Sequence, residues 1–180
     1  QLANSIEALS RRDLKLADSV IHADEQMDQM EAAIEEKAIL TIAKRQPMAS
    51  DLRSLMVSIR IASDLERIGD LAKNVAKRAH AFSDGVPRRL AAGLDRMGKL
   101  SQAQLKMVLD AYAASDLEKA LEVWRHDEDI DALYNSIFRE LLTYMLEDPR
   151  MIGTCTHLLF ATKNIERIGD HTTNIAENIY

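Results

Sequence analysis

Acidic side chains recur at helical spacing in two places of the sequence, each pair followed by an asparagine four residues later. The two sets are Glu66, Asp70 and Asn74 in the first half and Glu166, Asp170 and Asn174 in the second. Residues four apart in a helix lie on one face, so the three side chains of each set project from the same helix edge. Carboxylate and amide oxygens are hard ligands. They suit iron first, then manganese, magnesium or calcium, and zinc less well.

A second acidic ladder lies upstream of each set. It comprises Asp24, Asp28, Glu31 and Glu35 in the first half and Asp127 and Asp131 in the second. Like charges four apart destabilise a helix by roughly a few tenths of a kcal/mol per pair, so the repeated arrangement calls for a compensating cation. The ladders therefore predict metal binding. The alternative is a solvated face, with Arg67 pairing with Asp70 and Arg167 with Asp170, or a set of interhelical salt bridges.

Apolar residues spaced by three and four predict the helices that position these acids. The stripe from Leu16 to Ile34 indicates a long helix over residues 13–45, and a second stripe indicates a helix over 49–82. A helix over 88–114 begins the second half, followed by one that carries Ala120 to Leu141 and a last one that carries Ile165 to Ile175. With 6 Gly, 3 Pro and 4% aromatic residues, the composition favours helices over sheets.

The chain is an internal duplication. Residues 64–70 match residues 164–170, and Asp24 and Asp28 match Asp127 and Asp131. The two halves meet at a turn-rich linker, which gives domains at 1–83 and 88–180. The predicted fold is all-α, with two antiparallel three-helix bundles in tandem. Residues 1–12 are short beside their counterpart, so the repeat predicts that roughly fifteen to twenty residues precede them.

Composition excludes several functions. With 23 Lys and Arg against 29 Asp and Glu, the net charge of −6 opposes nucleic-acid binding. No apolar run is long enough to insert into a membrane, and a single cysteine, Cys155, fits a cytoplasmic protein. The sequence has no glycine-rich phosphate loop and no Glu-x-x-His pair of the kind that di-iron bundles use. Arg53, Arg60 and Arg67 form a basic stripe, which is either a solvated face or a site for phosphate or an acidic partner.

Longer motifs resemble a known family. Ala43-Lys44-Arg45-Gln46-Pro47-Met48-Ala49-Ser50-Asp51-Leu52-Arg53, the stretch Asp64 to Asp70 and its copy at Ile165 to Asp170 are similar to those of the PhoU family of bacterial phosphate-signalling proteins. The resemblance implies tandem three-helix bundles that act by binding. It also implies a negative regulator that couples the ATPase of the phosphate ABC transporter to a phosphate-sensing histidine kinase of a two-component system.

The resemblance also implies metal sites, because some family members bind iron clusters or other ions through acidic motifs of this kind. It assigns Glu66, Asp70, Glu166 and Asp170 as ligands, supported by the upstream aspartates and extended by the two asparagines. The second half replaces the basic turn with Glu147 to Gly153, so the two sites need not be equivalent.

Three functions are compatible with this sequence. The first is a non-enzymatic regulator tuned by metal, which we expect to be a homodimer because its helices carry long apolar stripes. The others are a metal-dependent carboxylate-bundle enzyme, which the absence of suitable histidines disfavours, and a purely structural dimerisation module.

Overall fold

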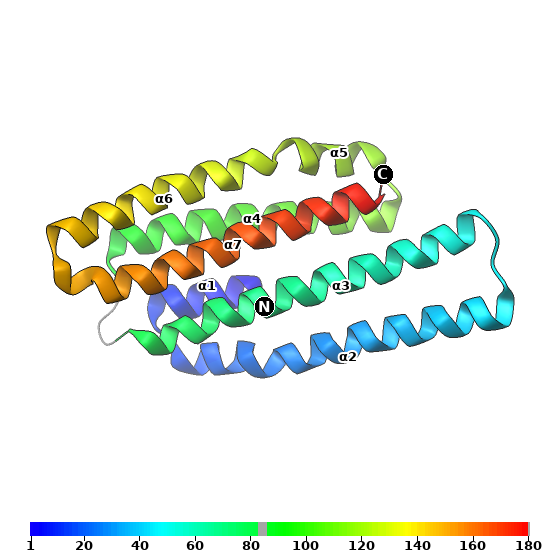
Figure 1. Ribbon diagram of the computed structural model, residues 1–180, viewed down its shortest axis with the longest axis horizontal. Coiled ribbons are helices and arrows are strands. Elements are labelled where there is room, and N and C mark those ends of the chain that lie inside the picture. The colour runs from blue at the N-terminus through cyan, green and yellow to red at the C-terminus, as the bar shows by residue number, and fades with distance from the viewer. Residues whose placement is uncertain (83–85, 180) are drawn as a thin grey trace.

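Every regular element in the computed structural model, which describes residues 1–82 and 86–179, is a helix. The elements are α1 (Leu2–Arg11), α2 (Leu14–Arg45), α3 (Ser50–Lys77), η1 (Arg78–Ala81), α4 (Arg88–Ala114), α5 (Leu117–Arg125), α6 (Asp127–Glu147), η2 (Pro149–Met151) and α7 (Ile152–Ile179). The two η elements are short 3-10 turns. The all-α fold of two antiparallel three-helix bundles in tandem is confirmed (Figure 1).

The same turn begins the long hairpin of each half. Arg12 ends α1 and Ser115 ends α4, both with a φ of 53°. The next residue then caps the following helix. Asp13 accepts a hydrogen bond from the Leu16 backbone N–H at 3.0 Å, and Asp116 accepts one from that of Lys119 at 3.1 Å. An aspartate in this place satisfies a backbone donor that the first turn of a helix leaves free.

The two bundles lie side by side and point in opposite directions. The α2–α3 hairpin extends beyond one end of the molecule, and the α6–α7 hairpin extends beyond the other (Figure 1). The halves meet where α3 packs along α7 and α1 packs along α4. As a result, the two helices that carry the repeated acidic motifs are direct neighbours.

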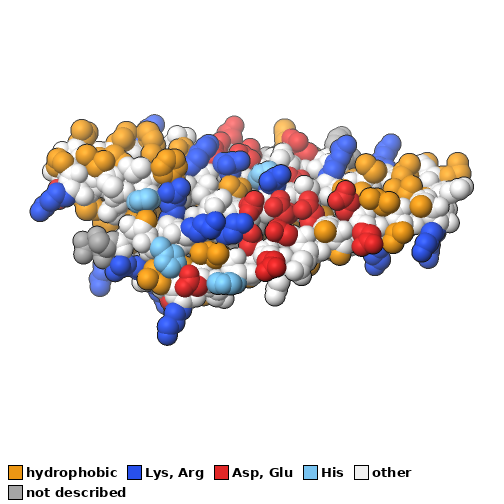
Figure 2. Space-filling view, turned by 60° about the horizontal axis from the view of Figure 1, so that its bottom comes forward, with side chains coloured by type: hydrophobic (Ala, Val, Ile, Leu, Met, Phe, Trp, Pro, Cys, Tyr) orange, Lys and Arg blue, Asp and Glu red, His pale blue; other side chains and the backbone are white. Residues whose placement is uncertain are grey.

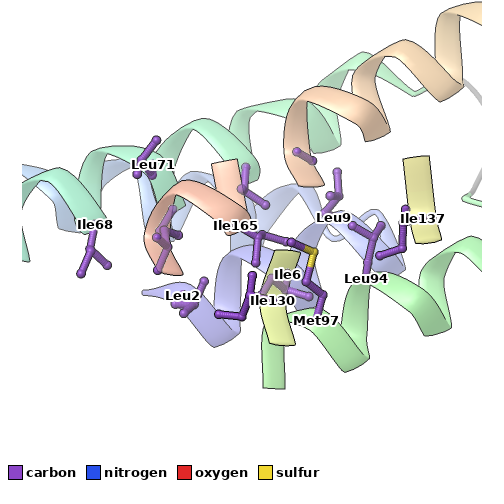
Figure 3. Packing of buried hydrophobic residues seen from close by; sticks show 14 of the residues in the cluster. Leu2, Ile6, Leu9, Ile68, Leu71, Leu94, Met97, Ile130, Ile137 and Ile165 are labelled. Carbon is purple, nitrogen blue, oxygen red and sulfur yellow. The ribbon is translucent and has the colours of Figure 1, made fainter. Parts of the chain in front are cut away.

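One hydrophobic core runs through both halves. It contains Leu9 of α1, Leu71 of α3, Leu94 and Met97 of α4, Ile130 of α6 and Ile165 of α7, all buried (Figure 3). The helices therefore pair as two bundles that share this main cluster. A second, smaller cluster lies in the first half and contains Ala8, Ala17, Val20, Ala76 and Ala79. The domain boundaries at 83 and 88 stay a prediction, and residues 83–85 of the predicted linker, like residue 180, lie outside the described residues.

The middle helix of the second half is interrupted, which the apolar periodicity did not predict. The chain turns at His126 between α5 and α6, whereas α2 is continuous. The break has a tertiary cause, because Gln104 of α4 donates a hydrogen bond from its amide to the His126 backbone carbonyl at 2.8 Å. Asp127, Glu128 and Asp129 then begin α6, where negative charge favours a helix N-terminus.

The predicted apolar stripe of α2 is only partly buried. Val20 is buried, but 59% of Met30 and 38% of Ile34 are exposed. In the second half, α4 has 27 residues and packs against both α6 and α7. Its counterpart in the first half, α1, has only 10 residues. The predicted helix over 49–82 is also slightly shorter, since its α-helical part ends at Lys77.

Candidate metal-binding site

The first acidic site lies between α2 and α3. Asp24 and Asp28 on α2 face Glu66 and Asp70 on α3. Burial of the carboxyl group raises the pKa of Glu66, and the charge of Asp70 raises it further. Glu31 and Asp28 on the facing helix, α2, raise the pKa of Glu66 by smaller amounts. On the side of the molecule where α2 lies, acidic side chains gather midway along the surface, with Lys and Arg beside them (Figure 2).

The second acidic site lies between α6 and α7. Burial raises the pKa of Asp131, and the charges of Glu166 and Asp127 raise it further. The pKa of Asp170 is raised in the same way, by burial first and then by Glu166, Asp127 and Asp131. These shifts mean that the four carboxylates are close enough to repel one another. The structure therefore brings the predicted acids of each half together across a helix pair.

A glycine sits where the helices of each site cross. A Cβ atom at Gly169 of α7 would lie 3.0 Å from Cδ1 of Ile130 on α6. At Gly69 of α3 it would lie 3.4 Å from both Oδ1 of Asp24 and Cγ of Met27 on α2. The glycines thus allow the close approach that places the acids of one helix opposite those of the other.

The main partners of the acids were not predicted from the sequence. In the first site the Lys73 ammonium forms ion pairs with both Asp24 and Asp70, across the two helices. In the second site Thr173 donates a hydrogen bond to Asp127 at 2.7 Å. Lys163 pairs with Glu166 at 2.6 Å. The lysines could have been found from their spacing of three from Asp70 and Glu166, since such pairs meet on a helix.

The predicted arginine pairs are weaker than these contacts. Arg67 lies 3.6 Å from a Glu66 oxygen and 4.0 Å from an Asp70 oxygen, and 62% of its side chain is exposed. Arg167 forms no ion pair with any residue that the structure describes. Exposed pairs of this kind contribute little to stability. The interhelical salt-bridge alternative fits the first site better, since Lys73 of α3 pairs there with Asp24 of α2.

The two predicted asparagines lie at exposed positions of α3 and α7. Asn74 is exposed, and Asn174 lines a groove with Arg60, Ser63 and Asp64 of α3. Asn174 therefore lies near α3. Their assignment as ligands stays a prediction.

The donor set fits hard cations in kind, but the side chains are not arranged around an ion. Oδ1 of Asp24 and Oε2 of Glu166 are buried without a hydrogen-bond partner, an arrangement that costs free energy unless a partner is supplied. Within residues 1–82 and 86–179, however, no three His, Cys, Asp or Glu side chains converge closely enough to hold a metal ion.

Two histidines beside the acids form other contacts. His126 lies 3.0 Å from Asp129, three residues further along the chain. His171 of α7 lies 2.9 Å from Asp64 of α3 and so joins the two halves. Neither contact involves one of the predicted ligands. As for the membrane, no helix in the described part of the chain combines the length and apolar character needed to cross one.

Comparison with known proteins identifies the family. The PhoU domain model matches residues 1–79 and 94–179. The phosphate-specific transport system accessory protein PhoU homolog of Rhizobium meliloti is 62% identical over 180 residues, which are 99% of this chain and 76% of that protein. The PhoU protein of Escherichia coli K12 is 41% identical over 180 residues, 100% of this chain and 75% of that protein.

Two crystal structures have the same fold. PhoU from Pseudomonas aeruginosa superposes with a TM-score of 0.94 at 40% identity, covering 99% of this chain and 86% of that one. The phosphate transport system regulatory protein PhoU from Streptococcus pneumoniae gives 0.89 at 29% identity, covering 99% and 84%. The chain therefore belongs to the PhoU family, whose members are named as accessory or regulatory proteins of phosphate transport and not as enzymes.

Proposed function

We propose that this chain, whose family has a role in regulating phosphate transport, is a negative regulator of phosphate uptake and of the phosphate-starvation response. It bridges the ATPase of the phosphate ABC transporter and a phosphate-sensing histidine kinase, and it acts in the cytoplasm as a homodimer. The observation that carries this proposal is the match of both halves of the chain to accessory proteins of phosphate-specific transport.

Metal binding at the acidic sites is the second part of the proposal. Iron is the preferred ion, with manganese, magnesium, calcium or zinc as other candidates. The residues that would hold it are Asp24, Asp28, Glu66, Asp70 and Asn74 in the first half and Asp127, Asp131, Glu166, Asp170 and Asn174 in the second. The ion supplies positive charge, and the raised pKa values of Asp131 and Asp170 support a need for that charge.

The charge on these acids affects how closely α6 and α7 approach each other. Carboxylates on α6 repel those on α7, and partial burial makes the repulsion stronger than it would be in water. Neutralisation therefore favours a closer approach of the two helices and changes the surface that a partner meets. A partner that binds the neutralised form more tightly would shift the protein toward it.

The test compares the wild type with a variant that lacks the four motif acids. The variant is Glu66→Gln/Asp70→Asn/Glu166→Gln/Asp170→Asn. A matched control removes four exposed acids elsewhere: Glu7→Gln/Asp95→Asn/Asp110→Asn/Glu118→Gln. Proteins purified without chelator or nickel resin are analysed for metal content, and their binding to the purified transporter ATPase and to the kinase is measured. Circular dichroism checks folding, and sedimentation gives the oligomeric state.

We expect metal and partner binding in the wild type and in the control, and loss of both in the four-acid variant. A folded variant that keeps both partners would refute the regulatory role of the acids and favour a structural dimerisation module. Failure of the wild type to bind either partner would refute the bridging function.

A further inference from the structure

We propose that the end of the α2–α3 hairpin, residues 37–60, binds the surface of an anionic lipid membrane. This segment is called the basic tip below. The inference goes beyond the proposed function and does not depend on metal. The binding is interfacial, which means that side chains enter the headgroup layer and that no segment crosses the bilayer.

The basic tip protrudes from the rest of the molecule. The α2–α3 hairpin extends beyond one end of the second half, and its turn lies at the far end of that extension (Figure 1). Hydrophobic side chains gather at this end, with Lys and Arg beside them (Figure 2). The exposed large apolar residues of the tip are Ile39, Leu40, Met48, Leu52 and Met56. Exposed apolar clusters of this kind mark interaction surfaces.

The same segment concentrates positive charge. It contains one acidic residue, Asp51, and five basic residues, so its net charge is +4 in a chain whose net charge is −6. The basic residues, all of them exposed, are Lys37, Lys44, Arg45, Arg53 and Arg60. The first four form no ion pair with any residue that the structure describes. Basic side chains beside exposed apolar ones are typical of surfaces that bind anionic lipid.

The apolar side chains surround the tip and do not form a single face. Ile39 and Leu40 are consecutive and so project about 100° apart around α2. They are 55% and 45% exposed, and Met48, between the two helices, is 81% exposed. A protein partner that packs on one side would leave part of this apolar surface in water. A headgroup layer can enclose a protruding tip on all sides, which favours lipid over an acidic protein.

The other hairpin provides an internal comparison. The α6–α7 hairpin protrudes at the opposite end of the molecule (Figure 1). It also exposes large apolar side chains, namely Leu142, Leu146, Ile152 and Phe160. Residues 137–160, however, carry two arginines against three acidic residues, a net charge of −1 with histidine neutral. The two tips therefore share apolar exposure but differ in charge, and the inference assigns anionic lipid to the basic tip only.

The experiment measures cosedimentation of the full chain with vesicles. One set of vesicles contains phosphatidylglycerol and phosphatidylethanolamine in equal parts, and the other contains phosphatidylcholine alone. The first variant is Lys44→Gln/Arg45→Gln. Its matched control is Lys99→Gln/Lys106→Gln, which removes the same charge from exposed positions on α4. Circular dichroism checks that every variant is folded.

A second basic variant covers a loss of folding in the first. Lys44 and Arg45 lie in the last turn of α2, where positive charge stabilises a helix end. Lys37→Gln/Arg53→Gln removes the same charge from the tip away from that turn. The apolar part of the surface is tested by Met48→Gln, with Leu146→Gln, at the other hairpin tip, as its control.

We expect the wild type to bind the vesicles that contain phosphatidylglycerol and not those of phosphatidylcholine. Each basic side chain near an anionic surface strengthens binding about fivefold, so both basic variants should bind about 25-fold more weakly. Met48→Gln should weaken binding by about tenfold. Both controls should bind like the wild type. Higher ionic strength should weaken wild-type binding, because salt screens the attraction.

Several results would overturn the inference. They are no binding of the wild type to anionic vesicles, equal binding to both kinds of vesicle, and equal binding by the basic variants and their control. Binding to the purified transporter ATPase and to the kinase is measured with the same variants in the absence of lipid. If vesicles do not bind and the basic variants lose one of these proteins, the tip binds an acidic protein surface instead. Failure of vesicle binding with both proteins still bound rejects the lipid site alone and leaves the bridging function standing.

Discussion

Replacing Gly169 by alanine should destabilise the protein, although alanine is the better helix former. The structure brings α7 so close to α6 that a Cβ atom at this position would lie 3.0 Å from Cδ1 and 3.5 Å from Cγ2 of Ile130. Only 1% of Ile130 is exposed, so its side chain has little room to move. The added methyl group must therefore displace Ile130 by a few tenths of an ångström, at the point where the acids of the two helices face each other.

The magnitude follows from two opposing effects. Glycine in a helix interior costs about 1 kcal/mol relative to alanine, and the substitution recovers that free energy. Forcing an additional carbon into a packed core costs about 1–3 kcal/mol. The net change is therefore a loss of about 0–2 kcal/mol in the free energy of unfolding.

A double-mutant cycle isolates the clash. Ile130→Val removes Cδ1, and alone it should cost about 0.5–1.5 kcal/mol. Because Ile130→Val removes the closest atom, Gly169→Ala should cost less in the Ile130→Val background than in the wild type. The assay is urea unfolding of the metal-free protein, followed by circular dichroism. Additive effects, within about 0.5 kcal/mol, would refute the reasoning.

Gly69→Ala provides the internal comparison. A Cβ atom at this position would lie 3.4 Å from the nearest atoms of Asp24 and of Met27, which is ordinary contact. The closest atom, at 3.2 Å, is the end of the Gln1 side chain. Here the gain in helix propensity should outweigh packing, so that the protein is unchanged or stabilised by up to about 1 kcal/mol. Equal losses at both glycines would contradict the geometry.

Two further predictions concern the interface between the halves and the effect of pH. A Cβ atom at Gly98 of α4 would lie 2.2 Å from Cδ1 of Ile6 on α1, so Gly98→Ala should lower the free energy of unfolding in urea by about 1–3 kcal/mol, whereas Gly153→Ala, with open space around it, should not. The pKa values of Asp131 and Asp170 are higher in the folded protein than their ordinary 3.8. The folded state therefore takes up protons first, and the metal-free protein should gain stability as the pH falls from 7 toward 4. This gain should be smaller in Asp131→Asn/Asp170→Asn when urea unfolding is measured across that range, and an equal gain would contradict it.

The placement of the acids was predictable because it depends on short spacings. Glu166 and Asp170 share a helix face by their separation alone, and the duplication shows that the pattern is not accidental. The helix starts were also determined locally, by the capping side chains of Asp13 and Asp116. The motifs identified the family before any of the geometry was known.

Features that depend on contacts between distant residues were not predictable. The interruption at His126 depends on a hydrogen bond from Gln104, a residue on another helix. The exposure of Met30 depends on which helices cover α2, which periodicity does not reveal. Lys73 was visible as a neighbour of Asp70, but its second partner, Asp24, lies 49 residues away in the chain.

The acidic sites are connected through the helices that carry them. The face of α7 next to its acids packs on α6, while another face packs on α3, whose own acids face α2. Asp64 and His171 join α3 to α7 at 2.9 Å, beside the two motifs. Protein interiors are closely packed. If neutralisation of the acids shifts α7 toward α6, we expect α3, which packs on α7, to shift as well. A charge change in the second half alone can therefore alter the surface of both halves.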